Sequence, residues 1–187
     1  MLGSLSKKIT SLVIAASSLF SSHLTPIFEN CTYRLQDDVL IFTGQLSNCY
    51  NKDIEQIMQS GQRILLEFTY RIHEQGNNIP LHVNSETHVI TYDVVDRVYT
   101  IDFTENGEST IYLDFLEAKR HFVRLEELAI QHIDFFEEGR RYFFEITATL
   151  KPVYLEEMEN NIELMKYWNN SPPSYSSPSF SLRELES

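Results

Sequence analysis

Glycine is scarce in this chain, since only 6 of its 187 residues are glycine. Loops that hold a phosphate or a dinucleotide need closely spaced glycines, because the backbone must approach the ligand directly. The chain has no such loop, and it also lacks the Gly-x-Ser-x-Gly and His-Glu-x-x-His patterns of hydrolases. We therefore expect no enzymatic activity, no catalytic residue and no cofactor.

Metal-ligand spacing is missing as well. The six histidines and two cysteines form no His-x-x-x-His or Cys-x-x-Cys pattern. His82 and His88, expected on neighbouring strands, are the one pairing that invites a closer look. Without a supporting pattern, we expect no metal site.

Cysteine occurs only as Cys31 and Cys49. An exported chain can join two such residues in a disulfide. If Cys31–Gln36 and Val39–Leu46 form a hairpin, however, Cys31 lies opposite Gly44 and Cys49 lies roughly 16 Å further along the chain. The chain would have to fold back at Ser47-Asn48 for a disulfide to form.

Positive charge is in short supply. The 15 lysine and arginine residues are outnumbered by 27 acidic residues, which gives a formal net charge of −12. Loss of Lys7 and Lys8 with a leader would lower that charge from −12 to −14. Because such a field repels phosphate backbones, we expect no nucleic-acid partner.

The longest apolar stretch near the N-terminus is short. Lys7-Lys8 is followed by Ile9–Phe20, about twelve mostly apolar residues, which is too short to span a bilayer comfortably. This is the composition of a signal peptide, so we read residues 1–22 as a signal peptide or, if uncleaved, as an N-terminal anchor that associates with the membrane. The chain is then exported, and is periplasmic or envelope-associated.

Alternating apolar residues dominate the rest of the chain. Gln62–His73 places Ile64, Leu66, Phe68, Tyr70 and Ile72 on one face, and Arg140–Leu150 repeats the pattern with Tyr142, Phe144, Ile146, Ala148 and Leu150. These segments predict the two central strands of a mostly β fold. We expect an antiparallel β-sandwich, immunoglobulin-like or a strongly curved sheet, with two or three short helices.

Turn and cap signals place the other elements. The sequence predicts a hairpin around Asp37-Asp38, a helix at Asn51–Ser60, an edge segment at Ile79–Val83, and a meander over Thr87–Val94, Val98–Thr104 and Ser109–Leu113. A second helix is expected at Asp114–Leu125, and Leu128–Phe136 fits a strand or a loop. Residues 23–168 form one β-rich domain, with helical spacing again over Glu156–Trp168.

The C-terminal segment changes composition. Residues 169–187 are rich in serine and proline and cannot bury enough apolar surface to order alone. They are a tail, or an extended segment laid over the sandwich. Several aromatic residues are expected outside the core and are candidates for an interaction surface: Tyr33, Tyr112, Tyr154, Tyr175 and Phe180.

Several local motifs, taken in order, resemble an uncharacterised family of exported bacterial proteins, domain of unknown function 4390. They are Ile57-Met58-x-x-Gly61 entering Ile64-Leu-Leu-Glu-Phe68, Val89-Ile-Thr-Tyr-Asp93 leading to Arg97-Val-Tyr99, Leu116-Glu-Ala118, Gly139-Arg-Arg-Tyr142 and Trp168. The resemblance runs from about Tyr33 to Phe180. The chain departs from it at Arg71–Asn78, where the family tends to have a basic, tryptophan-rich turn. The resemblance implies an envelope location and no particular activity.

These observations favour a non-enzymatic envelope protein that acts as a protein-interaction or structural module, with an unidentified protein partner in the bacterial envelope. The alternative is a carrier for a small apolar ligand such as a lipid. A carrier would need a cavity between the inward rows of Ile64–Ile72 and Tyr142–Leu150. Those rows are large and aromatic, which favours a filled core.

Overall fold

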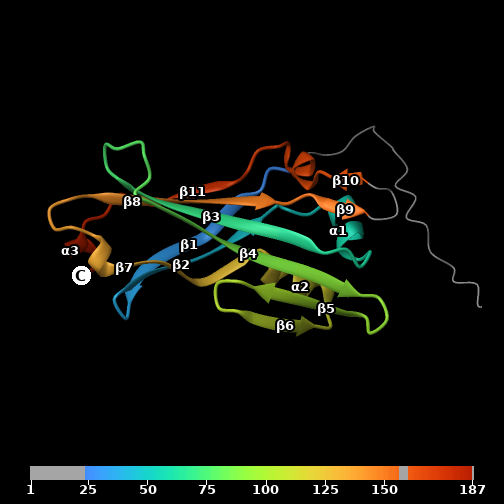
Figure 1. The fold of residues 1–187 in the computed structure, drawn as a ribbon. Coiled ribbons are helices and arrows are strands. Elements are labelled where there is room, and N and C mark those ends of the chain that lie inside the picture. Colours follow the sequence, from blue (N-terminus) through green and yellow to red (C-terminus); the bar gives the residue numbers. More distant parts are fainter. Residues whose placement is uncertain (1–23, 156–159, 187) are drawn as a thin grey trace, which may run out of the picture.

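Two packed antiparallel sheets of unequal size make up most of the protein (Figure 1). The computed structural model describes residues 24–155 and 160–186, and about 50% of the chain is strand. The prediction of a mostly β antiparallel fold with short helices is confirmed. The predicted signal peptide or anchor, residues 1–22, lies outside the described residues.

The larger sheet has six strands, and its long central strands are those with the clearest alternation in the sequence. Their order across the sheet is β11 (Ser174–Ser176), β8 (Tyr142–Leu150), β3 (Ile64–Glu74), β4 (His82–Asp93), β5 (Val98–Phe103) and β6 (Glu108–Tyr112). All ten residues predicted to point inward from β3 and β8 are buried. The opposite face carries polar residues such as Thr69 and Thr147, which lie directly opposite each other.

The smaller sheet contains β1 (Ile27–Gln36), β2 (Val39–Ser47) and β7 (Arg124–His132), with β2 in the middle. Asp37 and Asp38 form the two-residue turn between β1 and β2, with φ angles of 49° and 63°. Positive φ at both positions is what a tight type I′ hairpin turn requires, and aspartate tolerates it better than most residues. The predicted hairpin is therefore confirmed.

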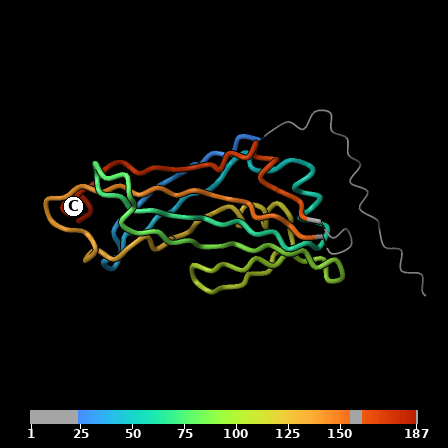
Figure 2. Tube along the Cα trace, turned by 45° about the horizontal axis from the view of Figure 1, so that its top comes forward, coloured from blue at the N-terminus to red at the C-terminus, as the bar shows by residue number. Residues whose placement is uncertain are grey.

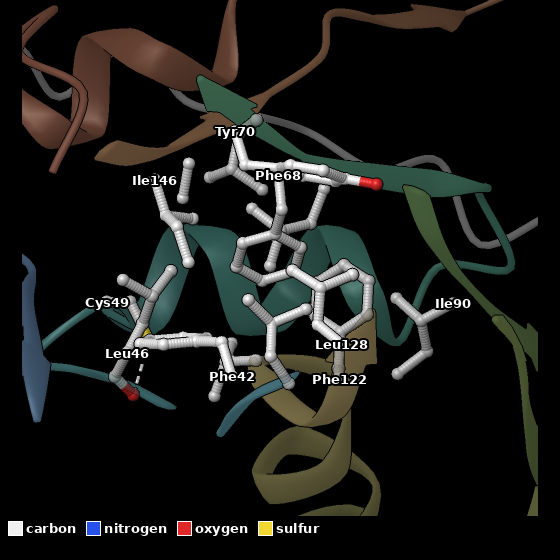
Figure 3. Close-up of a cluster of buried hydrophobic side chains, with 14 of the residues drawn as sticks. Phe42, Leu46, Cys49, Phe68, Tyr70, Ile90, Phe122, Leu128 and Ile146 are labelled. Atoms are coloured by element: carbon white, nitrogen blue, oxygen red, sulfur yellow. Dashed lines mark hydrogen bonds between the residues drawn. The ribbon is translucent and has the colours of Figure 1, made fainter. Parts of the chain in front are cut away.

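Large side chains fill the space between the two sheets (Figure 3). Phe42 from the smaller sheet and Phe144 from the larger one are both fully buried, and their ring centroids lie 5.9 Å apart. Figure 3 shows Phe68, Leu128 and Ile146 in the same layer. Burial of each such side chain stabilises the fold by about 1.5–3 kcal/mol.

Two short helices begin where the sequence predicts them. The side chain of Asn51 accepts a hydrogen bond from Ile54 N (3.0 Å) at the start of α1 (Lys52–Met58), and Asp114 accepts one from Glu117 N (2.9 Å) at the start of α2 (Phe115–Phe122). α2 ends three residues earlier than predicted. Leu46 N in β2 donates to Val123 O (3.0 Å), so the chain leaves the helix there to pair as β7.

β4 is one continuous strand of twelve residues, whereas the sequence predicted separate segments at Ile79–Val83 and Thr87–Val94. Pro80 lies before the strand. The first half of β4 pairs with β3 alone among the described strands, and β5 joins from His88 onward. The predicted meander of β4, β5 and β6 is confirmed.

The helix predicted over Glu156–Trp168 does not form as such. β9 (Val153–Leu155) pairs with β10 (Asn160–Ile162), and a short 3-10 helix (η3) follows at Leu164–Trp168. Residues 156–159 lie outside the described residues. Strand pairing therefore overrides the helical spacing of the apolar residues here. A second 3-10 turn (η1) at Ile133–Phe135 follows β7.

The serine- and proline-rich segment is extended, as one of the two alternatives left open by its composition had it, but it joins the edge of the larger sheet and does not lie over a face of the sandwich. β11 pairs with β8, and Phe180 exchanges two backbone hydrogen bonds of 2.8 Å with Tyr142. Figure 2 shows this segment running along β8, toward the short helix α3 (Leu182–Leu185) at the C-terminus. Its ordering depends on pairing with β8 at the edge of the sheet.

None of the helices in the described part of the chain combines the length and apolar character that a membrane crossing requires.

Candidate interaction surface

β6 lies at the free edge of the larger sheet. The turn before it contains Asn106 and Gly107; Gly107 has a φ of 68°, and Asn106 Oδ1 accepts from Glu108 N (2.9 Å). This turn sets a register that places Tyr112 opposite Tyr99. Among the described residues, β6 pairs with β5 alone.

Three large apolar side chains near this edge are exposed to solvent. Ile111 is 64% exposed, Leu113 is 81% exposed and Leu116 is 63% exposed, and they lie within six residues of one another. We call these three residues the edge patch. Single exposed apolar residues are ordinary, but several close together in the chain at the edge of a sheet are typical of an interaction surface.

α2 determines which face of β6 is exposed. Its Phe115 ring stacks on Tyr99 (centroids 5.2 Å apart), and its His121 ring stacks on Tyr112 (5.0 Å). Tyr112 therefore faces the helix, and Ile111, the next residue along the strand, faces the opposite side. Ala118 and Phe122 turn toward the core, which leaves Leu116 on the outer side of the helix.

The surroundings of the edge patch are acidic. The chain from Val98 to Glu117 contains five acidic residues and no lysine or arginine. Four of the five are exposed, and none of those four forms a salt bridge within the described part of the chain: Asp102, Glu108, Asp114 and Glu117. Burial raises the pKa of Tyr112, and the negative charge of Glu117 raises it further.

Basic residues on α2 offset this charge incompletely. Lys119 is paired with Glu55 of α1 and lies 4.8 Å from the ring centroid of Phe115. Arg120 is exposed on the helix. Acidic side chains therefore outnumber basic ones along the edge of β6.

A buried histidine–glutamate pair fixes the β5–β6 turn to the core. His88 is fully buried; its Nδ1 lies 2.8 Å from Phe122 O, and its Nε2 lies 2.7 Å from Glu105 Oε1. A carbonyl oxygen can only accept, so Nδ1 must carry a proton and donate it. The ring is enclosed by Phe68 and Phe103, with centroids at 5.0 and 4.8 Å. This contact joins β4, the turn and the end of α2.

The five aromatic residues expected at an interaction surface do not gather in one place. Tyr154 is exposed (55%), but Phe180 is buried (3%) and its expected exposure is wrong. Tyr33 and Tyr175 are half-buried against the core, with Tyr33 5.5 Å from Phe144 and Tyr175 5.2 Å from Phe42. Tyr112 lies under α2. These residues belong largely to the packing of the C-terminal segment and the helix.

The expectation that His82 and His88 lie on neighbouring strands is wrong. His82 and His88 lie on the same strand, β4, six residues apart. Both ring nitrogens of His88 are hydrogen-bonded, one to Phe122 O and the other to Glu105 Oε1. The ring centroid of His82 lies 6.1 Å from the ring centroid of Phe135. The part of the chain that the structure describes holds no group of three or more His, Cys, Asp or Glu placed to bind a metal ion.

Cys31 and Cys49 are both free thiols in the structure. Cys31 lies in a bulge of β1 across from Gly44, as the predicted hairpin register required; a Cβ at Gly44 would lie 3.2 Å from its Sγ. Cys49 is buried beyond the end of β2, with its Sγ 3.9 Å from Leu46 O. Burial raises the pKa of Cys49 to about 12, so its thiol stays protonated at neutral pH.

Sequence reasoning missed the edge patch because β6 carries apolar residues on both faces. Tyr112 was assigned to the outer face, and Ile111 and Leu113 received no role. The hairpin register contained the missing signal: a turn at Asn106-Gly107 places Tyr112 directly opposite Tyr99, which is buried. Residues opposite each other in a ladder share a face, so Ile111 must face outward.

Comparison with known proteins assigns a family. The model of the family described as "Domain of unknown function (DUF4390)" matches residues 25–175. The chain belongs to this family. The DUF4390 match covers both sheets, α1, α2 and the edge patch, and ends within β11. No curated protein and no solved structure matches the chain.

Proposed function

We propose that this DUF4390 protein is a non-enzymatic module of the bacterial envelope that binds another protein, or supports assembly, through its edge patch. The observation that carries the proposal is the exposure of Ile111, Leu113 and Leu116 in and just after β6, the edge strand of the larger sheet. Burial of such side chains against a partner would remove a large apolar area from water. The leader-like residues 1–22 support the envelope location.

A carrier for a small apolar ligand such as a lipid is the alternative. A carrier needs an internal cavity lined by apolar side chains. Here Phe42 and Phe68 are fully buried and occupy that space (Figure 3). Phe144 is also fully buried, with its ring centroid 5.9 Å from that of Phe42. This packing favours the interaction module.

Native purification of the full chain from its own envelope tests the proposal. Three forms are compared: the wild type, a Leu113→Asp/Leu116→Asp double variant, and Ile79→Asp/Leu81→Asp as a control that adds the same two charges. Ile79 and Leu81 are 73% and 45% exposed and lie in the loop between β3 and β4, at the opposite end of β4 from the turn that adjoins Leu113. The matched control separates loss of the patch from a general effect of added negative charge.

The proposal expects a stoichiometric protein partner with the wild type and with Ile79→Asp/Leu81→Asp, and loss of that partner with Leu113→Asp/Leu116→Asp. Native mass spectrometry of the same samples tests the alternative function, a carrier with a bound lipid. A bound lipid without any protein partner would overturn the proposal in favour of the carrier. N-terminal sequencing of the purified chain tests export separately: a chain that still begins at Met1 and fractionates with the cytosol would contradict it.

A further inference from the structure

We infer that β6 takes its partner by strand addition, and that the partner is an extended segment with alternating apolar residues flanked by lysine or arginine. This inference rests on the proposed function and specifies the partner class. Strand addition joins an extended peptide to an exposed sheet edge through main-chain hydrogen bonds, with alternate side chains contributing specificity.

The backbone of β6 directs N–H and C=O groups away from the sheet, as strand addition requires. Thr104 N donates to Thr87 O (3.2 Å), so even-numbered residues of β5 direct their backbone groups toward β4. The odd-numbered residues of β5, including Tyr99, then direct theirs toward β6. Because Tyr99 lies opposite Tyr112, the N–H and C=O groups of Ser109 and Ile111 point away from the sheet.

The other free edges of the two sheets are blocked or short. Two of the outward amides in the first half of β4 are occupied: Ser85 N donates to Asn84 Oδ1 (2.8 Å) and Thr87 N donates to Thr104 Oγ1 (2.6 Å). β1 and β7 both carry bulges that interrupt their registers, and β11 has three residues. Bulges and short strands are common protections against edge pairing. The five-residue register of β6 with β5 has no such interruption.

The outer face favours apolar and β-branched residues on the added strand. Thr91, Thr100 and Ile111 lie side by side across β4, β5 and β6. A strand added next to β6 would place one of its side chains beside Ile111, and Leu113 continues the same face beyond the end of β6. Directly opposite β-branched or apolar pairs each stabilise a sheet by about 0.2–1 kcal/mol.

The charged residues around β6 determine which kind of strand can pair with it. Asp102, Glu108 and Asp114 are exposed close to the edge and have no cationic partner among the described residues. A segment with lysine or arginine on either side of its apolar core would complement them. A second copy of this chain would bring the same acidic edge and a net charge of −12, so pairing of β6 with itself is opposed.

The test measures binding of two synthetic peptides to the full chain by fluorescence anisotropy. The probe is Lys-Lys-Val-Thr-Val-Thr-Val-Lys-Lys with blocked ends, and its counterpart has glutamate at each lysine position. The protein variants are Ile111→Pro and Val83→Pro. Proline at position 111 removes an outward amide without removing a bond to β5, and Val83→Pro makes the same kind of change on the unpaired half of β4.

We expect the wild type to bind the lysine peptide at least about tenfold more tightly than the glutamate peptide. Ile111→Pro should weaken that binding by about tenfold or more, and Val83→Pro should leave it unchanged. If Ile111→Pro fails to fold, Ile111→Lys replaces it, because a lysine there repels the lysine peptide while keeping the amide.

Three results would overturn strand addition at β6: no binding of the lysine peptide, equal binding of both peptides, or equal weakening by Val83→Pro. A dimer of the wild type that dissociates in Ile111→Pro would make a second copy the occupant and would also overturn it. The proposed function is judged independently, by whether Leu113→Asp/Leu116→Asp loses the envelope partner.

Discussion

Trp168 and Cys49 are joined by a hydrogen bond, in which the indole Nε1 donates to the backbone carbonyl of Cys49 across 3.0 Å, although 119 residues separate them. Both residues are 2% exposed. The bond attaches η3 to the chain leaving β2, so the region after β8 is fixed to the first hairpin. The C-terminal part of the chain is therefore an integral part of the core.

Replacing Trp168 with phenylalanine should lower the free energy of unfolding by about 1–3 kcal/mol, because the carbonyl of Cys49 is left buried without its donor. Urea unfolding followed by circular dichroism measures this. Tyr154→Phe, a change at an exposed ring, should have almost no effect. If the two substitutions have equal effects, the buried hydrogen bond makes no detectable contribution to stability.

Phe180→Ala should destabilise the protein by about 3–5 kcal/mol, because it removes a buried ring and leaves a cavity. The ring contacts Phe136 and Tyr33, with centroids at 5.6 and 5.9 Å. Tyr154→Ala, an exposed aromatic truncation, serves as the control and should change stability little. A small effect of Phe180→Ala would mean that the C-terminal segment is not held against the sheet in solution.

Much of the fold could be predicted because burial of one sheet face leaves a period of two in the sequence. β3 and β8 show that period over their full length, and both are central strands. The predictions failed where pairing with a strand that is distant in the sequence determines the local structure. Apolar spacing continued the second helix to Leu125, but pairing of the following chain with β2 ends the helix at Phe122.

The candidate site was harder to predict than the fold. Phe180 looked exposed because serine and proline surround it, and its burial depends on Tyr142, which lies far away in the sequence. The outward face of β6 depends on α2, whose Phe115 and His121 cover the opposite face. The sequence of β6 alone contains apolar residues on both faces, so its own pattern could not settle the orientation.

Phe68→Asp and Thr69→Asp test the assignment of the two faces of β3. Phe68 is fully buried, so an unpaired carboxylate there should destabilise the protein by about 4–5 kcal/mol or prevent folding. Thr69 lies on the opposite face, where the same substitution should cost less than about 1 kcal/mol. Denaturant unfolding of both variants measures the difference. Equal effects would mean that the faces are reversed.

We predict that the buried thiol of Cys49 makes the protein less stable at high pH. Burial raises the pKa of its thiol from 9.0 to about 12, so between those values the unfolded chain releases a proton that the folded chain keeps. The associated stability is complete below pH 9 and is lost as the pH rises toward 12. The free energy of unfolding should fall by about 1 kcal/mol per pH unit over this range, relative to Cys49→Ala.

The measurement is urea unfolding of the wild type and Cys49→Ala at several pH values from 8 to 11. The difference between them isolates the thiol from the tyrosines, whose pKa values are also raised by burial. Cys31→Ala is the matched control, since Cys31 is only half-buried. A difference that does not change with pH would show that the Cys49 thiol is accessible to solvent.

Photo-crosslinking in living cells tests the central claim, that the edge patch contacts another protein. A photoreactive amino acid replaces Leu113 in one form of the full chain and Ile79, in the loop between β3 and β4, in another; both positions are more than 70% exposed. The account predicts one discrete protein adduct from position 113 and none from position 79. Equal protein adducts from both positions, or no protein adduct from position 113, would contradict it.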